Sequence, residues 1–253
     1  MNPVIVRNVK IGEGIPKICV PIVGVTAEEI INEAKALQGL AYDMVEWRAD
    51  WFEDVFEFEK VKKVLADLRK ELDDAPILFT FRTANEGGEK SIDKEAYLAL
   101  NQVAAASGDV DLLDVEIFSD EDTVRSIIEY AHDKGVKVVG SNHDFQKTPP
   151  QDEIVKRLQK MQELGADILK VAVMPQTKKD VITLLAATEE MVTNYAAQPV
   201  VTMSMSGQGV ISRLAGEVFG SAITFGAAKK ASAPGQIPVG ELEQVLAIIH
   251  KSI

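Results

Sequence analysis

Short apolar runs of strand length recur along the chain, and longer segments whose apolar residues have helical spacing lie between them. Some runs, such as residues 136–139 and 168–173, are almost continuously apolar, which is typical of parallel strands covered on both faces. The pattern therefore predicts a repeated strand–helix order. The eight predicted strands are Lys17–Val23, Tyr42–Arg48, Ile77–Thr83, Val110–Ile117, Val136–Asn142, Asp167–Val173, Val200–Ser204 and Ala222–Phe225.

Helix start and stop signals occur in the segments between these strands. A side-chain oxygen that can bind the first free backbone N–H groups marks a start, and a glycine marks an end. Thr26 has Glu29 three residues later, which is the pattern of a capping box. The predicted caps and the glycines that end their helices are Thr26 with Gly39, Ser119 with Gly135, and Thr148, which precedes Pro149, with Gly165.

The number of strand–helix units indicates the fold class. Eight units in 253 residues fit a (β/α)8 TIM barrel that forms a single domain over residues 1–253. Before the first unit, residues 4–6 and 9–11 flank Arg7-Asn8, which predicts a short N-terminal β-hairpin that closes the barrel floor. A doubly wound open sheet is the alternative, but such sheets usually have a glycine-rich turn after the first strand, and none follows here.

Composition and charge exclude several classes of protein. The chain is 46% hydrophobic, but no run approaches the roughly 18 to 20 apolar residues that span a bilayer, and it starts without a signal-peptide pattern, so we expect a cytoplasmic protein. Its 27 basic and 39 acidic residues give a net charge of −12, which disfavours binding to nucleic acid. Cys19, the one cysteine, lies in an apolar run, so we expect a buried thiol and no disulfide.

Polar residues interrupt the predicted strands at regular positions. Alternate residues of a barrel strand point inward, so Met44, Glu46 and Arg48 share one direction. This inward set becomes polar toward the carboxyl end of the strand, where active sites of such barrels lie, and other strands behave in the same way. The ionisable residues that converge on this end are Glu46, Arg48, Arg82, Asp114, Glu116, His143 and Lys170.

Lys170 interrupts the apolar run 168–173, where a charged ammonium group is costly to bury. One interpretation is catalytic: burial and nearby cations favour a neutral amine, which attacks a ketone and forms a Schiff base. The other interpretation is a structural ion pair inside the barrel, with Asp114 or Glu116 as the partner. The position of the lysine on its strand favours the catalytic interpretation.

His143 ends the strand next to the one that carries Lys170, and neighbouring strands lie about 4.8 Å apart, so the two side chains can meet. A histidine there can transfer protons near neutral pH, and Glu86 could hold its ring. Alternatively, the histidine only hydrogen-bonds a loop and Glu86 is an ordinary loop carboxylate. His132 and His250 fall in predicted helices at the surface and Cys19 is buried, so no set of transition-metal ligands assembles. Acidic residues alone could bind Mg²⁺, but the nearby arginines disfavour it, so we predict no metal site, and we expect no cofactor.

Three arginines, Arg48, Arg82 and Arg213, would create a local positive site in a protein of net charge −12, which predicts an anionic small-molecule substrate. Each could equally be a surface residue or the partner of a carboxylate. Residues 229–238, after the last strand, are rich in small and turn-forming residues, so they are predicted to form a mobile lid with hydrogen-bonding groups on Ser232 and Gln236. An ordinary loop would have the same composition.

Several blocks of sequence carry a resemblance to a known family. The blocks are LDVEI at 113–117, VVGSNHD at 138–144, EWR at 46–48, FTFR at 79–82, KVAVMP at 170–175, GVISR at 209–213 and ASAPGQ at 231–236. Together they cover nearly the whole predicted barrel and resemble the type I 3-dehydroquinate dehydratases of the shikimate pathway.

The resemblance implies a cofactor-independent lyase that removes water from 3-dehydroquinate by syn elimination to give 3-dehydroshikimate. By the same resemblance, Lys170 forms an imine with the ring ketone, His143 is the general acid and base, and Glu86 holds its imidazole. It also implies that Arg213 binds the substrate carboxylate and that the enzyme is a homodimer. The other implied contacts are Glu46, Arg48 and Arg82 to the ring hydroxyls and for charge balance, Ser232 and Gln236 over the pocket, and Met203, Met205 and Phe225 as apolar walls.

Two other functions stay open on the residues alone. A class I aldolase also has a Schiff-base lysine on an inner barrel strand, but it cleaves a C–C bond instead of a C–O bond. A non-catalytic anion-binding barrel would use Lys170 and the arginines only to hold a carboxylate.

Overall fold

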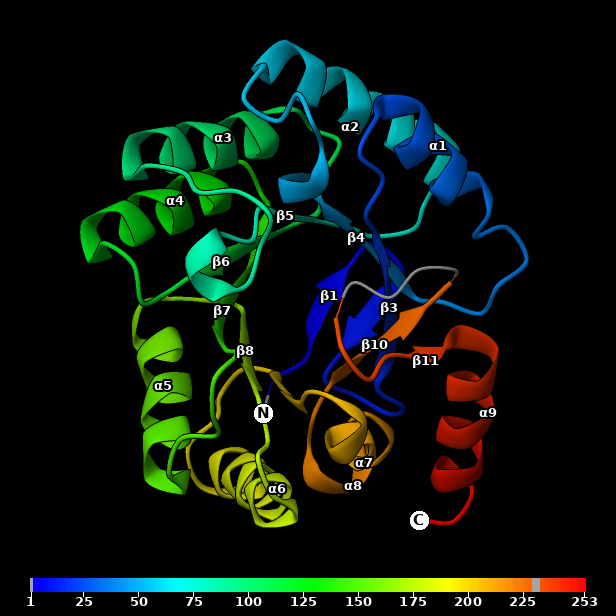
Figure 1. The fold of residues 1–253 in the computed structure, drawn as a ribbon, viewed down its shortest axis with the longest axis vertical. Coiled ribbons are helices and arrows are strands. Elements are labelled where there is room, and N and C mark those ends of the chain that lie inside the picture. The colour runs from blue at the N-terminus through cyan, green and yellow to red at the C-terminus, as the bar shows by residue number, and fades with distance from the viewer. Residues whose placement is uncertain (1, 229–232) are drawn as a thin grey trace.

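The computed structural model describes residues 2–228 and 233–253 and shows a curled parallel sheet ringed by helices (Figure 1). Strands β3 to β9 pair in chain order, β10 pairs back with β3, and a bridge between Val200 and Ser221 links the two remaining edges. The predicted (β/α)8 barrel is therefore confirmed. Its strands are β3 Lys17–Ile22, β4 Met44–Arg48, β5 Ile77–Thr80, β6 Leu112–Glu116, β7 Lys137–Asp144, β8 Ile168–Val173, β9 Val200–Ser204 and β10 Ile223–Ala227.

Helices cover the outer surface of the barrel. The principal ones are α1 Ala27–Lys35, α2 Phe58–Leu72, α3 Lys94–Ala106, α4 Glu121–Asp133, α5 Gln151–Glu163, α6 Lys178–Asn194 and α9 Val239–His250. Shorter elements are η1 Ala49–Trp51, η2 Ala84–Glu86, η3 Gly207–Gly209, α7 Val210–Leu214, α8 Gly216–Phe219 and the strand β11 Ile237–Pro238, which pairs with β10. The outward residues of the strands, Trp47 and Phe79 among them, are buried under the helices, where they form the larger of two apolar clusters.

One of the three predicted helix caps is confirmed. Thr26 accepts a hydrogen bond from the backbone N–H of Glu29, whose side chain accepts in return from the backbone of Thr26, so α1 begins with a capping box.

The other two predicted caps are wrong. Asp120, not Ser119, caps α4: its carboxylate accepts from the N–H of Thr123 at 3.0 Å, and a carboxylate also interacts favourably with the helix dipole. Ser119 donates to the carbonyl oxygen of Glu116 instead. Thr148 donates to a carbonyl of the next loop, and α5 begins only at Gln151, without a side-chain cap. In both cases a contact outside the helix holds the hydroxyl that we had assigned to the cap.

The predicted N-terminal hairpin closes the amino-terminal end of the barrel. Strands β1 Val4–Val6 and β2 Val9–Ile11 pair antiparallel, and Val6, Val9 and Ile11 are buried. They pack on an apolar layer inside the barrel, which we call the floor layer. Its members are Cys19, Met44, Leu78, Leu112, Val139, Ile168, Val201 and Ile223.

Cys19 is a buried free thiol, as predicted, and burial raises its pKa well above the ordinary value. In the part of the chain that the structure describes, no helix has the length and apolarity needed to cross a membrane.

Candidate active site

A cavity that opens to solvent lies at the carboxyl end of the barrel strands. It brings together eight of the nine residues that the sequence proposed for the site. The ninth, Ser232, lies outside the described residues. The lining residues are Glu46, Arg48, Arg82, Glu86, Gly87, His143, Phe145, Lys170, Ala172, Met203, Met205, Arg213, Phe225, Ala233 and Gln236.

Lys170 lies deep in this cavity, on β8, and only 4% of the residue is exposed. Its Nζ is 2.9 Å from Asp114 Oδ2 and 3.7 Å from Glu46 Oε1, and it lies 4.7 Å from the centre of the Phe225 ring. The structural ion pair considered for this lysine is thus present, with Asp114 and not Glu116. Lys170 also lines the cavity, so the ion pair leaves this residue within reach of a small molecule.

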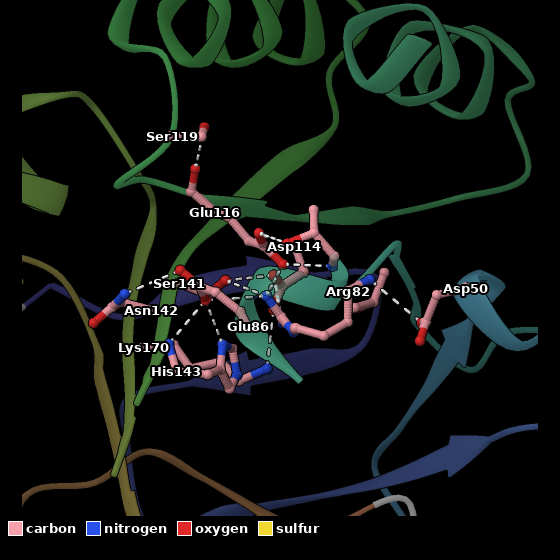
Figure 2. A network of polar contacts seen from close by, with 12 residues as sticks. Asp50, Arg82, Glu86, Asp114, Glu116, Ser119, Ser141, Asn142, His143 and Lys170 are labelled. Carbon is pink, nitrogen blue, oxygen red and sulfur yellow. Dashed lines mark hydrogen bonds and ion pairs between the residues drawn. The ribbon is translucent and has the colours of Figure 1, made fainter. Parts of the chain in front are cut away.

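Asp114, which is itself fully buried, is the centre of a polar network (Figure 2). It accepts hydrogen bonds from Lys170 Nζ, from Arg82 Nη2 at 2.8 Å and from the hydroxyl of Ser141. Burial by itself would raise the pKa of Asp114, but Arg82 and Lys170 hold it well below its usual range. Asp114 is therefore a carboxylate near neutral pH.

His143 and Glu86 form a hydrogen-bonded pair beside Lys170. Glu86, at the end of η2, accepts from His143 Nδ1 at 2.9 Å and from the His143 backbone N–H at 2.8 Å, both through Oε2. Its other oxygen, Oε1, accepts from Asn142 Nδ2 at 3.0 Å, and Arg82 Nη1 lies 3.7 Å from Oε2. Every one of these neighbours offers a donor, so the arrangement suits an ionised Glu86 and a histidine that carries its proton on Nδ1.

The two members of this pair have shifted pKa values. Burial, together with Arg82 and Lys170, lowers the pKa of His143 well below its usual value, so the ring is neutral near pH 7. Burial raises the pKa of Glu86 to about 7, although Arg82 opposes the shift. A neutral ring with its proton on Nδ1 has an unprotonated Nε2, which can accept a proton.

Two of the three predicted arginines are already paired with carboxylates. Arg48 donates to both oxygens of Asp50, each at 2.8 Å, and Asp50 is fully buried. Arg82 binds Asp114 and, at 3.0 Å, Glu116. The structural alternative that the sequence left open therefore describes part of what these arginines do, although both also line the cavity.

Arg213 differs from the other two because no carboxylate among the described residues lies within ion-pairing distance. Only 2% of the residue is exposed. Its Nη2 donates to the carbonyl of Pro234 at 3.1 Å, its Nη1 lies 3.9 Å from the Met203 sulfur, and its Nε has no hydrogen-bond partner among the described residues. Burial lowers the pKa of Arg213 to about 10, so the group is still charged at neutral pH. A buried cation with free donors at a cavity wall is a site for an anion.

Sequence reasoning missed three residues that shape the cavity. Asp50 positions Arg48 and lies two residues beyond it, where continuing the inward alternation past the strand would have found it. Phe145 and Gly87 both line the wall, and a Cβ on Gly87, whose φ is +84°, would overlap the Phe145 ring. That contact joins two loops, so no local pattern indicates it.

The carboxylates here do not form a metal site. Among the described residues, no group of three or more His, Cys, Asp or Glu side chains is arranged to hold a metal ion. Those at the site are held by arginine, lysine and hydroxyl groups instead.

Residues 18–253 match the family model described as type I 3-dehydroquinase. The chain is 56% identical to a 3-dehydroquinate dehydratase of Clostridioides difficile over 98% of this chain and 97% of the relative, and 58% identical to one of Listeria monocytogenes over 99% of both.

Solved structures agree with the sequence matches. A crystal structure of a type I 3-dehydroquinate dehydratase from Clostridium difficile, with covalently modified comenic acid, is 56% identical, covers all of both chains and superposes with a TM-score of 0.98. A 3-dehydroquinate dehydratase from Geobacillus kaustophilus is 38% identical, with 99% of each chain covered and a TM-score of 0.96.

Proposed function

The chain belongs to the type I 3-dehydroquinate dehydratase family, lyases of the shikimate pathway, and from that premise we propose that it eliminates water through an imine on Lys170. Membership of the family gives the reaction: 3-dehydroquinate loses water to form 3-dehydroshikimate. It also sets aside the aldolase and the non-catalytic barrel. The observation that supports the imine is the buried Lys170 amine at the cavity, beside a neutral histidine on the next strand.

Arg213 binds the substrate carboxylate in this proposal. It is the buried cation at the cavity wall that lacks a carboxylate partner among the described residues, so a bound carboxylate would supply the missing counterion. Glu46, Arg48 and Arg82 engage the ring hydroxyls and balance charge, and Gln236 closes over the ring. Ser232, assigned the same closing role, lies outside the described residues. Met203, Met205 and Phe225 form the apolar wall.

The first chemical step joins Lys170 to the ring ketone. The ammonium group first loses a proton, for which the unprotonated Nε2 of His143 is the acceptor, and the free amine then attacks the carbonyl carbon. A C–N bond forms and the carbonyl oxygen becomes a hydroxyl group, which takes the proton back from His143 and leaves as water. An iminium ion and a neutral histidine remain. Asp114 lies against Nζ and is ionised near neutral pH, so it is the counterion of that iminium.

The elimination follows on the iminium. Its positive charge makes the adjacent C–H acidic, and His143 takes that proton while the electron pair moves into the C–N system. The resulting enamine expels the hydroxyl group, which receives the proton from His143 and leaves as water. Glu86 keeps the imidazole oriented through both transfers. Hydrolysis of the conjugated iminium then releases the product and restores the lysine.

Borohydride trapping tests the covalent step. Reduction in the presence of 3-dehydroquinate should fix a substrate-sized adduct on the peptide that contains Lys170, found by intact mass and peptide mapping, and Lys137, on the same face of the sheet at its amino end, should stay unmodified. Turnover of 3-dehydroquinate without an adduct on Lys170 would contradict the imine. An adduct without formation of the conjugated enone, followed by its ultraviolet absorbance, would contradict the elimination step.

We further propose that residues 1–253 act as one barrel domain and that two copies form a homodimer, for which the support is the family resemblance. Sedimentation equilibrium should give twice the mass of one chain at micromolar concentration, and a single-chain mass at that concentration would contradict the dimer.

A further inference from the structure

A chain of hydrogen bonds leads from the outer surface of the barrel to the active-site histidine. Arg157, on α5, donates from Nη1 to Asn142 Oδ1 at 2.8 Å. Asn142 Nδ2 donates to Glu86 Oε1 at 3.0 Å, and Glu86 Oε2 accepts from His143 Nδ1 at 2.9 Å. Figure 2 shows the inner three residues of this chain beside Lys170. Arg157 itself is placed by Glu153, one helical turn earlier, with which it forms an ion pair.

We propose that Arg157 is a positioning residue for the dehydration: by fixing the amide of Asn142, it keeps Glu86 in the ionised, accepting form that orients the ring of His143 with Nε2 toward the substrate. The inference rests on the proposed role of His143 as the proton carrier. It adds a residue that touches neither substrate nor lysine.

The direction of the Asn142 amide follows from the chemistry of arginine. A guanidinium group only donates hydrogen bonds, so the amide oxygen must face Arg157 and the amide nitrogen must face Glu86. With the amide turned over, two donors would face each other at Arg157, and the oxygen would face Glu86. A carboxyl group can satisfy that oxygen only when it is protonated, so the reversed amide would stabilise neutral Glu86.

Protonation of Glu86 would change what His143 can do. A neutral carboxyl whose proton faces the reversed amide still accepts from Nδ1 through Oε2, but it has lost the negative charge that stabilises a protonated imidazole, so His143 becomes a weaker base. Because the pKa of Glu86 is raised to about 7 by burial, a small extra stabilisation of the neutral form shifts the balance within the working pH range.

Other charges face this pair from the neighbouring strands, and none of them sets the amide. Arg82 lies 3.7 Å from Glu86 and lowers its pKa, while Glu116 raises it. Burial, Arg82, Lys170 and Arg48 lower the pKa of His143, and Asp114 raises it. Around Arg157 lie Glu153 and, at 3.8 Å, Asp144 Oδ2. The effect of Arg157 is therefore directional, through Asn142, in addition to its own charge.

The test is the pH profile of kcat/KM for Arg157→Met. We expect the acidic limb to move to higher pH by about half a unit to one unit, so that activity at pH 6 falls by about three- to tenfold while activity at pH 8.5 stays within twofold of the wild type. Lys156→Met is the matched control. Lys156 is on the same helix and pairs with Asp152 one turn earlier, but it is exposed and takes no part in the hydrogen bonds that lead to His143. Its limb should not move.

A double-mutant cycle tests whether Arg157 acts through the amide of Asn142 or only through its own charge. Asn142→Leu should shift the limb by itself, and adding Arg157→Met should then change little. Additive shifts, or an unmoved limb in a folded Arg157→Met enzyme, would overturn the inference. If Arg157→Met does not fold, Arg157→Gln, whose amide can turn to offer either a donor or an acceptor, tests the same point by the same shift.

Glu86→Gln distinguishes failure of this inference from failure of the mechanism. If Glu86→Gln leaves the acidic limb unchanged, the proposed Glu86–His143 pair is itself wrong. If it abolishes the limb but Arg157→Met has no effect, only the role of Arg157 is wrong.

Discussion

The two ends of the barrel interior are built from the same alternating strand positions but have opposite chemistry. At the amino end, the floor layer and the hairpin are apolar and almost fully buried. At the carboxyl end, the next inward residues of the same strands are charged: Met44 is followed by Glu46 and Arg48, and Ile168 by Lys170. The alternation that stabilises one end therefore carries the reactive groups at the other.

The difference shows where stability and activity are separated. Each buried apolar residue of the floor contributes favourable transfer free energy, about 1.5 to 3 kcal/mol for a large side chain. Each buried charge at the carboxyl end of the barrel is stable only through its partners, as Lys170 is through Asp114. Substitutions in the floor layer should therefore change the free energy of unfolding, and substitutions at the carboxyl end of the barrel should change catalysis.

Replacing Lys170 should give the largest effect. Lys170→Met keeps most of the volume and removes the nucleophile, so we expect kcat to fall by at least about 10⁴-fold while the fold is retained, because Asp114 still pairs with Arg82. Steady-state turnover of 3-dehydroquinate measures it. Lys137→Met, at the amino end of β7, is the control and should keep near-normal activity. A Lys170→Met enzyme within tenfold of the wild type would refute covalent catalysis.

Replacing His143 with alanine tests whether proton transfer and imine formation depend on different residues of the active site. Since the amine and the proton carrier are separate groups, kcat should fall by about 10²- to 10⁴-fold while borohydride still traps some imine. His132→Ala, on the exposed side of α4, controls for loss of a histidine and should have no such effect. Undiminished turnover in His143→Ala would remove this residue from the mechanism.

Two isoleucines of the N-terminal hairpin, one buried and one exposed, test how much the floor layer contributes to stability. Ile11 is fully buried and Ile5, on the preceding strand, is 66% exposed. We expect Ile11→Ala to lower the free energy of unfolding by about 2 to 5 kcal/mol and Ile5→Ala to change it by less than about 0.5 kcal/mol, as measured by urea denaturation. Both should leave kcat nearly unchanged. A fall in kcat for Ile11→Ala under fully folded conditions would break the separation between the two ends.

Arg213→Met should have the smallest effect of the four, and it should affect binding. Loss of charge-assisted hydrogen bonds worth about 1.5 to 3 kcal/mol raises KM by roughly 10- to 150-fold. Because the arginine is buried without a carboxylate partner among the described residues, its removal should not lower stability to urea. Arg125→Met, an exposed residue of α4, is the control. An unchanged KM would place the carboxylate elsewhere.

Much of the fold could be predicted because its signals are local. Period-two alternation and continuous apolar runs located all eight strands, and only their ends differed. β7 extends to Asp144, two residues beyond the predicted end, because residues 142–144 continue to pair with residues 171–173 of β8. That pairing is a property of the neighbouring strand and leaves no signal within residues 136–144. The wrong caps at Ser119 and Thr148 have the same cause, since other groups bind those hydroxyls.

The sequence could predict which residues belong to the site, but not how their charged groups pair with one another. The inward alternation brought Glu46, Lys170 and His143 to one end of the barrel. It could not show that Arg48 and Arg82 are paired with carboxylates while Arg213 has none among the described residues. Asp114 and Glu116 lie on β6, some thirty residues after Arg82, which follows the end of β5, so their approach depends on the register of the closed sheet.

The sequence by itself determined which side chains each strand offers to the interior, because alternation along a strand is set by backbone geometry at each residue. The tertiary structure decided which charges meet, which stay unpaired and which protons they hold. Those properties depend on burial and on charges a few ångströms away, and both are created only when distant segments pack: Lys170 against Asp114, Glu86 against His143, and Arg157 against Asn142.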